Sequence, residues 1–545
     1  MDNLALIRKE MDKNNVDLWI GHSYDAHSSE YICEHDNVIK FASGFTGENG
    51  TLAVFACAAP QGNCDNEMCG AYLWVDGRFF IQAPKETEGK GITIMKMDEP
   101  GVPKFSDWLE DKKVKGLKIS EDPELIDPAW KDRPKRPCNK IWIHSAEYED
   151  RSAAEKIEEV RRILAEKKEA IWIRKLDEIA WLTNLRGSDI DYNPVFFSYM
   201  YIDMNRAVIF LQEHAADDEV KTYLSKNGID IKSYNEAIKP ENAVESNIIT
   251  DLKACKTESE ASHMEECNIR DAAVLTKFIY SLKKLQPASS KAPETLTELE
   301  AGQMLDGMRS ENERFLGLAF PTICAYGEHG AIIHYRSSEK TNIAIENKSF
   351  LLVDSGAHYL DGTTDVTRTI AMGKLTYEEK KHYTLVMMGM LRLMNAAFDE
   401  DTDSSVLNDI ARKPLIDNGL NFNHGVGHGI GYLNVVHEDP VRIFKTKTGF
   451  TFKAGMVVSN EPGVYIEKSH GVRIENMLIC LPKNEGLGWK NLTWAPLERE
   501  AVLPEIMTAE DIKYYNEYQS EVKRRLAPFM TDEELEWLNS ICSSI

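Results

Sequence analysis

The sequence predicts a chain that combines α/β and α+β architecture, with two related α/β domains followed by a larger α+β domain. The first observation is length, because 545 residues exceed what one hydrophobic core supports and favour about three domains. The second is a repeated order of helices and strands in the first half of the chain. The third is a long amphipathic helix that precedes a region of predicted hairpins. We therefore expect domains at residues 1–145, 146–256 and 257–545.

The repeated order consists of a helix, a strand, an apolar helix, a glycine-containing loop and paired strands. In the first domain a helix leads into a strand at residues 16–20, and an apolar helix follows at residues 38–41. In the second, a helix at 152–168 leads into a strand at 170–173, and an apolar helix covers 178–182. We interpret this repetition as an internal duplication of one α/β unit.

The third domain is predicted to open with a long helix. Thr257 and Glu260 have the Thr-x-x-Glu spacing that is typical of a capping box at a helix start. The amphipathic pattern continues to about Leu285, and the run at residues 287–290 is expected to end the helix.

Composition and charge exclude several classes of protein. Hydrophobic residues make up 43% and charged residues 28% of the chain, which is ordinary for a globular protein. The net charge of −24 disfavours nucleic acid or an anionic membrane surface as the main partner. The first residues do not have the pattern of a signal peptide, and no later run reaches the roughly 18 apolar residues of a membrane helix. The ten cysteines are scattered, which is typical of reduced thiols in a cytoplasmic protein.

Three of these cysteines, Cys57, Cys64 and Cys69, cluster in one polar loop. A small structural metal site is one interpretation, but the Cys-x-x-Cys pairs typical of zinc sites are missing. We therefore favour a local insertion with free thiols.

A first predicted hairpin carries two carboxylates. The apolar run at residues 350–353 predicts a buried strand that ends at Asp354. A return strand at 366–371 follows the turn-forming pair at 361–362, so Asp354 and Asp365 are expected to face each other across one hairpin.

A second hairpin repeats this arrangement, since Glu461 and Glu475 flank a predicted turn at residues 468–471. Between the two hairpins, residues 424–431 are too rich in glycine for a stable helix and predict an extended strand. Its histidines, His424 and His428, are then expected to project from one face.

Four buried carboxylates raise one another's pKa values steeply unless cations neutralise them. Taken singly, each would more often be a capped turn or a surface charge. Oxygen-rich ligand sets with one imidazole suit divalent ions, and a carboxylate can bridge two ions about 3.5–4 Å apart. The sequence therefore predicts a two-metal centre that activates a bridging water for hydrolysis. The predicted ligands are Asp354, Asp365, His428, Glu461 and Glu475.

Five segments around these residues resemble the metallopeptidases of the pita-bread fold. They are residues 353–357, 361–369, 424–431, 460–463 and 473–476. Methionine aminopeptidases and prolidases share the ligands, so the ligands alone indicate only the superfamily. Four surrounding segments narrow the resemblance to the long, three-domain cytosolic aminopeptidase P (Xaa-Pro aminopeptidase) group of metallopeptidase family M24. They are residues 74–79, 184–189, 330–335 and 433–438.

The resemblance implies a role for each ligand. Asp354 would hold one ion, Asp365 and Glu475 would bridge, and His428 and Glu461 would hold the other ion. Glu461 is also the expected proton shuttle. Manganese is the metal that the resemblance implies, although the ligand set does not separate it from cobalt, zinc or iron.

Further residues match positions that contact or orient groups at the site. His334, His437 and His424 are expected catalytic residues near the scissile carbonyl and the proline pocket, where an imidazole can donate to a developing oxyanion. Arg473 is expected to orient a ligand carboxylate. The N-terminal domains are expected to narrow the entrance and to take part in a homodimer.

The sequence thus predicts a cytoplasmic metallo-aminopeptidase that removes the first residue from peptides with proline in second position. No membrane or nucleic-acid partner is expected. The first alternative is a prolidase that acts on Xaa-Pro dipeptides. The second is a non-catalytic pita-bread protein that binds peptides or other proteins.

Overall fold

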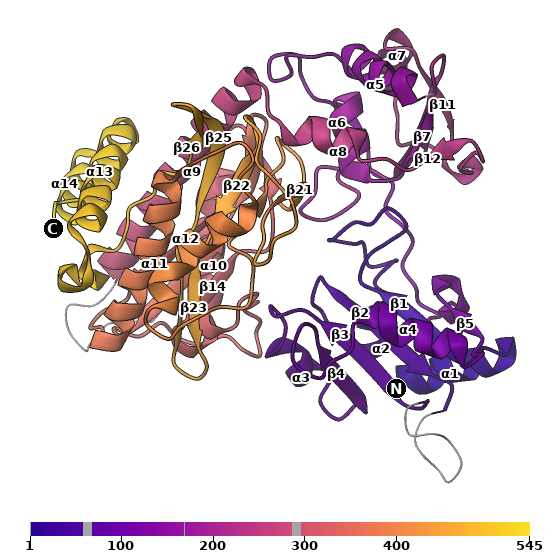
Figure 1. Cartoon of the computed structure of the whole chain (residues 1–545), viewed down its shortest axis with the longest axis horizontal. Helices are drawn as coiled ribbons and strands as arrows, with labels where there is room; N and C mark the ends of the chain where they lie inside the picture. Colours follow the sequence, from indigo (N-terminus) through magenta and orange to yellow (C-terminus); the bar gives the residue numbers. More distant parts are fainter. Residues whose placement is uncertain (1, 58–67, 168, 286–295) are drawn as a thin grey trace.

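The computed structural model describes residues 2–57, 68–167, 169–285 and 296–545 (Figure 1). The N-terminal unit contains α1 (Asn3–Asn14), β1 (Leu18–His22), α2 (Val38–Ser43), β2 (Gly50–Phe55), β3 (Ala71–Val75), α3 (Gln82–Glu86), β4 (Ile92–Lys96), α4 (Phe105–Val114) and β5 (Ile119–Ser120). The middle unit contains β6 (Trp142–Ile143), α5 (Ala153–Lys167), β7 (Ala170–Ile173), α6 (Leu176–Thr183), β8 (Leu185–Arg186), β9 (Ser198–Ile202), β10 (Ala207–Leu211), α7 (Asp218–Lys226), β11 (Ile229–Ser233), β12 (Ala243–Val244) and α8 (Ile248–Ala254).

The C-terminal unit is the largest. Its helices are α9 (Glu258–Leu285), α10 (Glu298–Ser310), the 3-10 helix η3 (Gly327–Ala331), α11 (Tyr377–Asn395), α12 (Ser404–Ile416), α13 (Ala509–Leu526) and α14 (Asp532–Ile541). Its strands are β13 (Phe315–Leu318), β14 (Ile323–Tyr326), β15 (Phe350–Ser355), β16 (Ala357–Tyr359), β17 (Gly362–Thr363), β18 (Val366–Ala371), β19 (Ala397–Phe398), β20 (Gly427–Gly429), β21 (Glu438–Ile443), β22 (Val457–Asn460), β23 (Gly463–Ile466), β24 (His470–Arg473), β25 (Asn476–Lys483) and β26 (Gly486–Asn491).

The N-terminal and middle units are built on sheets of the same topology. The first sheet has the strand order β4-β3-β2-β1-β5 and the second β11-β10-β9-β7-β12. In each sheet the three central strands pair antiparallel and the two outer strands pair parallel. The duplication of one α/β unit predicted from the sequence is therefore confirmed.

Helix α9 begins where the sequence predicted it. The Thr257 backbone N–H donates to Glu260 Oε2 over 2.8 Å, and the Glu260 N–H donates to Thr257 Oγ1 over 3.2 Å. These reciprocal bonds satisfy two backbone donors that a helix start leaves unpaired. The predicted terminator at 287–290 lies outside the described residues, as does Cys64 of the predicted cysteine cluster.

The C-terminal unit folds around one large core. Leu351 and Val353 of β15 and Ile370 of β18 belong to the same buried cluster as Tyr383 and Met387 of α11. Figure 1 shows α13 and α14 at the end of the molecule farthest from the N-terminal unit. In the part of the chain that the structure describes, no helix combines the length and the hydrophobicity needed to cross a membrane.

The first hairpin predicted from the sequence is present, but the connection between its two strands differs from the prediction. β15 pairs antiparallel with β18, but a second hairpin, β16 with β17, is inserted between them and joins a different sheet with β13. Asp354 therefore lies opposite Thr367, and Asp365 sits one residue before β18 begins. The two carboxylates are diagonal neighbours, because residues two apart on a strand project from the same face.

The predicted extended segment at 424–431 is a strand only over β20. Its glycines are required by close backbone contacts: a Cβ atom at Gly427 would lie 1.8 Å from the carbonyl oxygen of Ser459, and one at Gly429 would lie 2.3 Å from that of Glu438. The glycine content therefore reflects the close packing of β20 between β21 and β22.

A buried polar network holds the middle unit against the C-terminal unit. Glu149 accepts from Lys156 over 3.0 Å and pairs with the His144 ring over 2.8 Å. Arg186 lies 3.5 Å from Glu149, and its Nε donates to the carbonyl of Leu433 over 2.6 Å. Burial raises the pKa of Glu149, but the hydrogen bond with His144 and the charges of Lys156 and Arg186 outweigh it and lower the pKa to about 2.

We expect Glu149→Gln to destabilise the protein at neutral pH by up to about 3 kcal/mol, because lowering a pKa by one corresponds to about 1.4 kcal/mol in favour of the charged form. A pKa that is lower in the folded state stabilises the fold above the unfolded value and loses that effect as pH falls. The difference in stability between the wild type and the variant should therefore disappear as the pH falls from about 4.5 to about 2. Thermal unfolding across this pH range measures the difference, with the surface substitution Glu158→Gln as control. Equal unfolding midpoints for the wild type and Glu149→Gln at pH 7 would contradict the prediction.

Candidate metal centre

The five predicted ligands come from two sheets of the C-terminal unit. Asp354 lies on β15, Asp365 just before β18 and His428 on β20. Glu461 follows β22, and Glu475 lies between β24 and β25. The Glu475 backbone N–H donates to the Thr367 carbonyl over 3.1 Å, which joins the two sheets beside the carboxylates.

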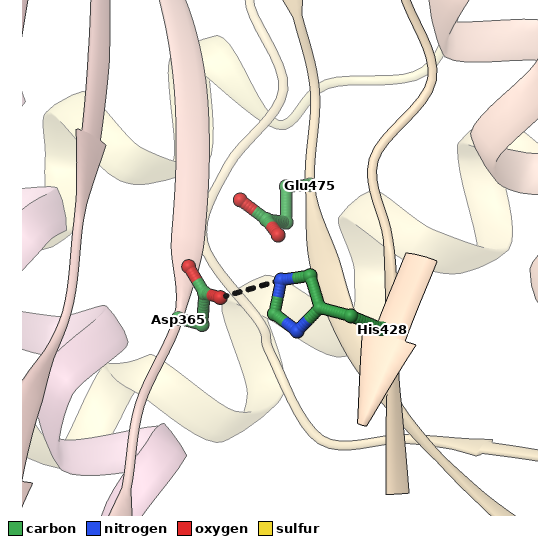
Figure 2. Close-up of side chains that lie close together, drawn as sticks. All are labelled: Asp365, His428 and Glu475. Carbon is green, nitrogen blue, oxygen red and sulfur yellow. Dashed lines mark ion pairs between the residues drawn. The ribbon is translucent and has the colours of Figure 1, made fainter. Parts of the chain in front are cut away.

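The side chains converge on one space, as Figure 2 shows for Asp365, His428 and Glu475. One ligand atom from each of these three residues lies within 4.8 Å of the other two. His428 Nε2 is 3.4 Å from Asp365 Oδ2 and 3.5 Å from Glu461 Oε1. The structure therefore brings the predicted ligands of both hairpins and of β20 together.

The tautomer of His428 follows from its backbone contact. Its Nδ1 lies 2.9 Å from the carbonyl oxygen of Gly429, so Nδ1 carries the hydrogen and donates. Burial, followed by the charge of His437, lowers the pKa of His428 well below its usual value. Nε2 is thus the unprotonated nitrogen, and it faces carboxylate oxygens, which is the arrangement of a metal ligand.

Burial of these carboxylates favours the binding of compensating cations. Burial and the charges of Asp354 and Glu461 raise the pKa of Asp365 well above its usual value, and burial and Asp365 do the same for Glu475. Burial, with a further contribution from Asp354, raises the pKa of Glu461 to about 7. Asp354 Oδ1 is buried without a hydrogen-bond partner among the described residues. These oxygens and one imidazole nitrogen fit hard or borderline divalent ions.

Arg473 compensates part of the negative charge. Its guanidinium donates to Asp354 Oδ2 over 2.6 Å and to the Tyr465 hydroxyl over 2.8 Å. Its Nε lies 3.2 Å from Thr367 Oγ1, which in turn donates to Glu475 Oε2 over 2.7 Å. Arg473 therefore contacts one ligand directly and another through Thr367, as expected for an orienting residue.

The three predicted catalytic histidines and the five ligands line one cavity of about 650 Å³. The His437 and His428 rings are perpendicular with centroids 4.1 Å apart. His334 packs its ring against that of Phe79, 5.4 Å away. His424 is engaged at both ring nitrogens, since Nδ1 donates to the Gly425 carbonyl over 2.7 Å and Nε2 lies 2.8 Å from the Tyr465 hydroxyl.

The N-terminal unit supplies carboxylates to this cavity that sequence reasoning missed. Glu30 Oε2 accepts from His437 Nδ1 over 2.5 Å, and Glu48 Oε2 lies 3.4 Å from His334 Nδ1. Arg78 pairs with Asp76 over 2.8 Å and with Glu30 over 3.4 Å. The only sequence signal was indirect, because Asp76 and Arg78 belong to one of the segments that carried the family resemblance.

Comparison with known proteins places the chain in a family. It matches the family model of metallopeptidase family M24 over residues 262–481, that of the creatinase/prolidase N-terminal domain over 132–283, and that of the C-terminal region of peptidase M24 over 485–545. A probable Xaa-Pro aminopeptidase P from Neurospora crassa is 35% identical over 617 aligned residues, covering 98% of this chain and 88% of the relative. A second one, from Sordaria macrospora, is also 35% identical and covers 98% of both chains.

A solved structure supports the same placement. The X-prolyl aminopeptidase from Caenorhabditis elegans, described as a cytosolic enzyme with a di-nuclear active site, is 29% identical and has a TM-score of 0.93. The match covers 100% of this chain and 99% of that one. The fold class and family predicted from the sequence are confirmed: this chain is an enzyme that belongs to metallopeptidase family M24, among the relatives of Xaa-Pro aminopeptidase P.

Proposed function

We propose that this metallo-aminopeptidase hydrolyses the bond before proline and releases the first residue of peptides with proline in second position. The observation that carries the proposal is the convergence of four carboxylates, one unprotonated imidazole nitrogen and three further histidines in one cavity. The relatives that cover nearly the whole chain are named for Xaa-Pro aminopeptidase activity, which favours this activity over that of a prolidase.

We propose that Asp354, Asp365, His428, Glu461 and Glu475 hold two divalent ions. Two observations support these assignments: Nε2 of His428 is unprotonated, and Oδ1 of Asp354 has no hydrogen-bond partner within the described residues. Following the family resemblance, Asp365 and Glu475 would contribute to holding both ions. When bound, the ions would polarise the scissile carbonyl and lower the pKa of a water molecule.

The protein's own groups have distinct tasks in this proposal. Glu461 takes a proton from the attacking water and delivers it to the leaving proline nitrogen. Its Oε1 accepts from Ser459 Oγ over 3.1 Å, which orients the carboxylate. His334 and His437 face carboxylates with Nδ1, which leaves Nε2 of each ring for the substrate. In the imidazolium form this nitrogen donates to the developing negative charge of the substrate carbonyl. His424 supports the site through Tyr465, which also accepts from Arg473.

Proline in second position calls for a dedicated cavity. The bond before proline is a tertiary amide without an N–H, and the ring restricts the backbone angle. A peptidase that holds its substrate as an added strand loses a hydrogen bond at this residue. Side chains around the reacting bond must then position the substrate, and here they come from both the C-terminal and the N-terminal unit.

We further propose manganese as the metal, following the family resemblance. We propose a cytoplasmic homodimer, supported by the family resemblance and by the cytosolic description of the Caenorhabditis elegans relative. The three units are proposed as domains with boundaries near residues 145 and 256.

The test measures hydrolysis of an Arg-Pro-Pro-type peptide before chelation, after chelation and after addition of single metals. We expect activity to fall to background on chelation and to return most fully with Mn²⁺. An Xaa-Pro-Xaa tripeptide should be cleaved and the matching Xaa-Pro dipeptide should not. Cleavage of the dipeptide alone would establish a prolidase instead, and a metal-loaded protein without peptidase activity would overturn the proposal.

A further inference from the structure

A carboxylate of the N-terminal unit contacts two residues of one segment in the C-terminal unit. Glu48 lies in the loop between α2 and β2, and its Oε2 is 3.4 Å from His334 Nδ1. Its other oxygen, Oε1, accepts from the guanidinium of Arg336, two residues after His334. One carboxylate therefore holds the segment that follows η3 at two points, across 286 residues of sequence.

The loop that carries Glu48 is fixed within its own unit. The Thr46 N–H donates to Glu86 over 2.8 Å, and the Gly50 N–H donates to Ser23 Oγ over 2.8 Å. At Gly47 a Cβ atom would lie 2.2 Å from the Phe45 ring and 2.8 Å from the Phe79 ring, so the backbone packs directly on both rings. Glu48 is thus presented from a preorganised support, which is what accurate positioning of a partner requires.

The contact selects one arrangement of the His334 ring. The Glu48 side chain is only 7% exposed. Although burial raises its pKa, the hydrogen bond with His334 and the charge of Arg336 lower it to about 2, so the group is a carboxylate that only accepts. His334 Nδ1 must then carry a hydrogen, and the perpendicular Phe79 ring limits rotation of the imidazole. The remaining nitrogen, Nε2, is left for the cavity that the metal ligands share.

We propose that Glu48 is a positioning residue for the reaction: it orients His334 from the N-terminal unit, and Arg336 holds the Glu48 carboxylate in place. The inference rests on the proposed function, because it assigns a support to one of the proposed catalytic histidines. Glu48 acts only through His334 and does not contact the reacting atoms. It follows that the N-terminal unit is part of the catalytic apparatus as well as a wall of the cavity.

The kinetic test is a double-mutant cycle on an Xaa-Pro-Xaa peptide with metal-loaded full-length protein. We expect Glu48→Ala to lower kcat about tenfold, as is common when an orienting partner is removed, with KM changed less than about twofold. In the His334→Ala background the same change should have no further effect, because two residues that act as one unit are not additive. Arg336→Ala should show a smaller loss of kcat. The control is Glu34→Ala, which removes a surface ion pair with Lys40 in the same unit and should leave kcat unchanged.

A structural readout separates this inference from the proposed function. In metal-free protein, Glu48→Ala and Arg336→Ala should speed amide hydrogen exchange across residues 332–337, and Glu34→Ala should not. If these two variants exchange faster but the wild type has no peptidase activity, the proposed function is overturned, and with it the catalytic role of Glu48. Unchanged exchange, or an equal loss of kcat in the wild-type and His334→Ala backgrounds, would overturn the positioning role alone.

Discussion

Asp365→Asn is expected to lower kcat/KM on Xaa-Pro-Xaa peptides by at least about a thousandfold, or about 4 kcal/mol of transition-state stabilisation. A neutral amide is a weaker ligand than a carboxylate and cannot bridge two cations in the same way. The variant should also bind less metal than the wild type when both are measured by elemental analysis. Full metal content with normal activity would remove Asp365 from the proposed ligand set.

In metal-free protein, the same substitution should increase the stability of the fold. Burial and the neighbouring carboxylates raise the pKa of Asp365 in the folded protein. A raised folded pKa favours folding below the unfolded value, and that contribution is lost as pH rises. At pH 7 the metal-free wild type bears the cost of the buried carboxylate cluster, and the asparagine variant bears less of it. Thermal unfolding of chelated protein should therefore show a higher midpoint for the variant than for the wild type at pH 7. The difference between the two midpoints should be smaller near pH 4.

Asp361→Asn is the matched control, four residues away in the β16–β17 hairpin. Asp361 is fully buried, and its carboxylate pairs with Arg270 over 2.6 Å and with Arg314 over 2.7 Å. Its loss should destabilise the protein by about 1–3 kcal/mol, with metal content unchanged. The two aspartates should thus show opposite signatures: one loses metal and stabilises the metal-free protein, and the other keeps metal and loses stability.

Local patterns in the sequence were sufficient to predict the elements that hold the ligands. The capping box at Thr257 and the apolar run before Asp354 depend on neighbours a few residues apart. The order of the five ligands along the chain is itself a sequence property. Each of these features could be recognised without knowing how distant segments meet.

The inserted β16–β17 hairpin was missed because its cause is a tertiary contact. At Gly356 a Cβ atom would lie 2.1 Å from the Thr364 carbonyl oxygen, so the chain can leave β15 and cross close to its own return path only with glycine there. In sequence the same glycine looks like an ordinary residue next to a turn. The register that sets Asp354 opposite Thr367 follows from this detour.

The carboxylates of the N-terminal unit could not be predicted for a related reason. Glu30 is separated from His437 by 407 residues, and nothing in the loop before α2 distinguishes it from a surface acid. Its contact depends on how the three units pack around one cavity. Hydrophobic periodicity reports which face of an element is buried, but it does not report which unit that face meets.

Arg473→Met is expected to destabilise metal-free protein by about 3–5 kcal/mol, the usual cost of leaving a buried charge without its partner. Arg473 is 2% exposed, and it is paired with Asp354 over 2.6 Å in the cavity that the other three carboxylate ligands also line. Bound cations would balance part of the carboxylate charge that the Arg473 guanidinium otherwise balances. The loss of stability should therefore be smaller in metal-loaded protein, and the stabilisation by Mn²⁺ should be larger in the variant than in the wild type.

Kinetics and a surface control complete this second test. Without the guanidinium, Asp354 loses the donor to its Oδ2 and Tyr465 loses the donor to its hydroxyl, so kcat should fall about 10–100-fold. Arg473→Lys keeps the charge but not the planar fork and should lie between wild type and Arg473→Met. Arg524→Met removes an exposed pair with Glu521 on α13 and should change stability by less than about 1 kcal/mol. Equal losses of stability with and without metal would show that Arg473 holds the β23–β24 hairpin in place and does not balance the charge of the carboxylates, because only the second role can be shared with a cation.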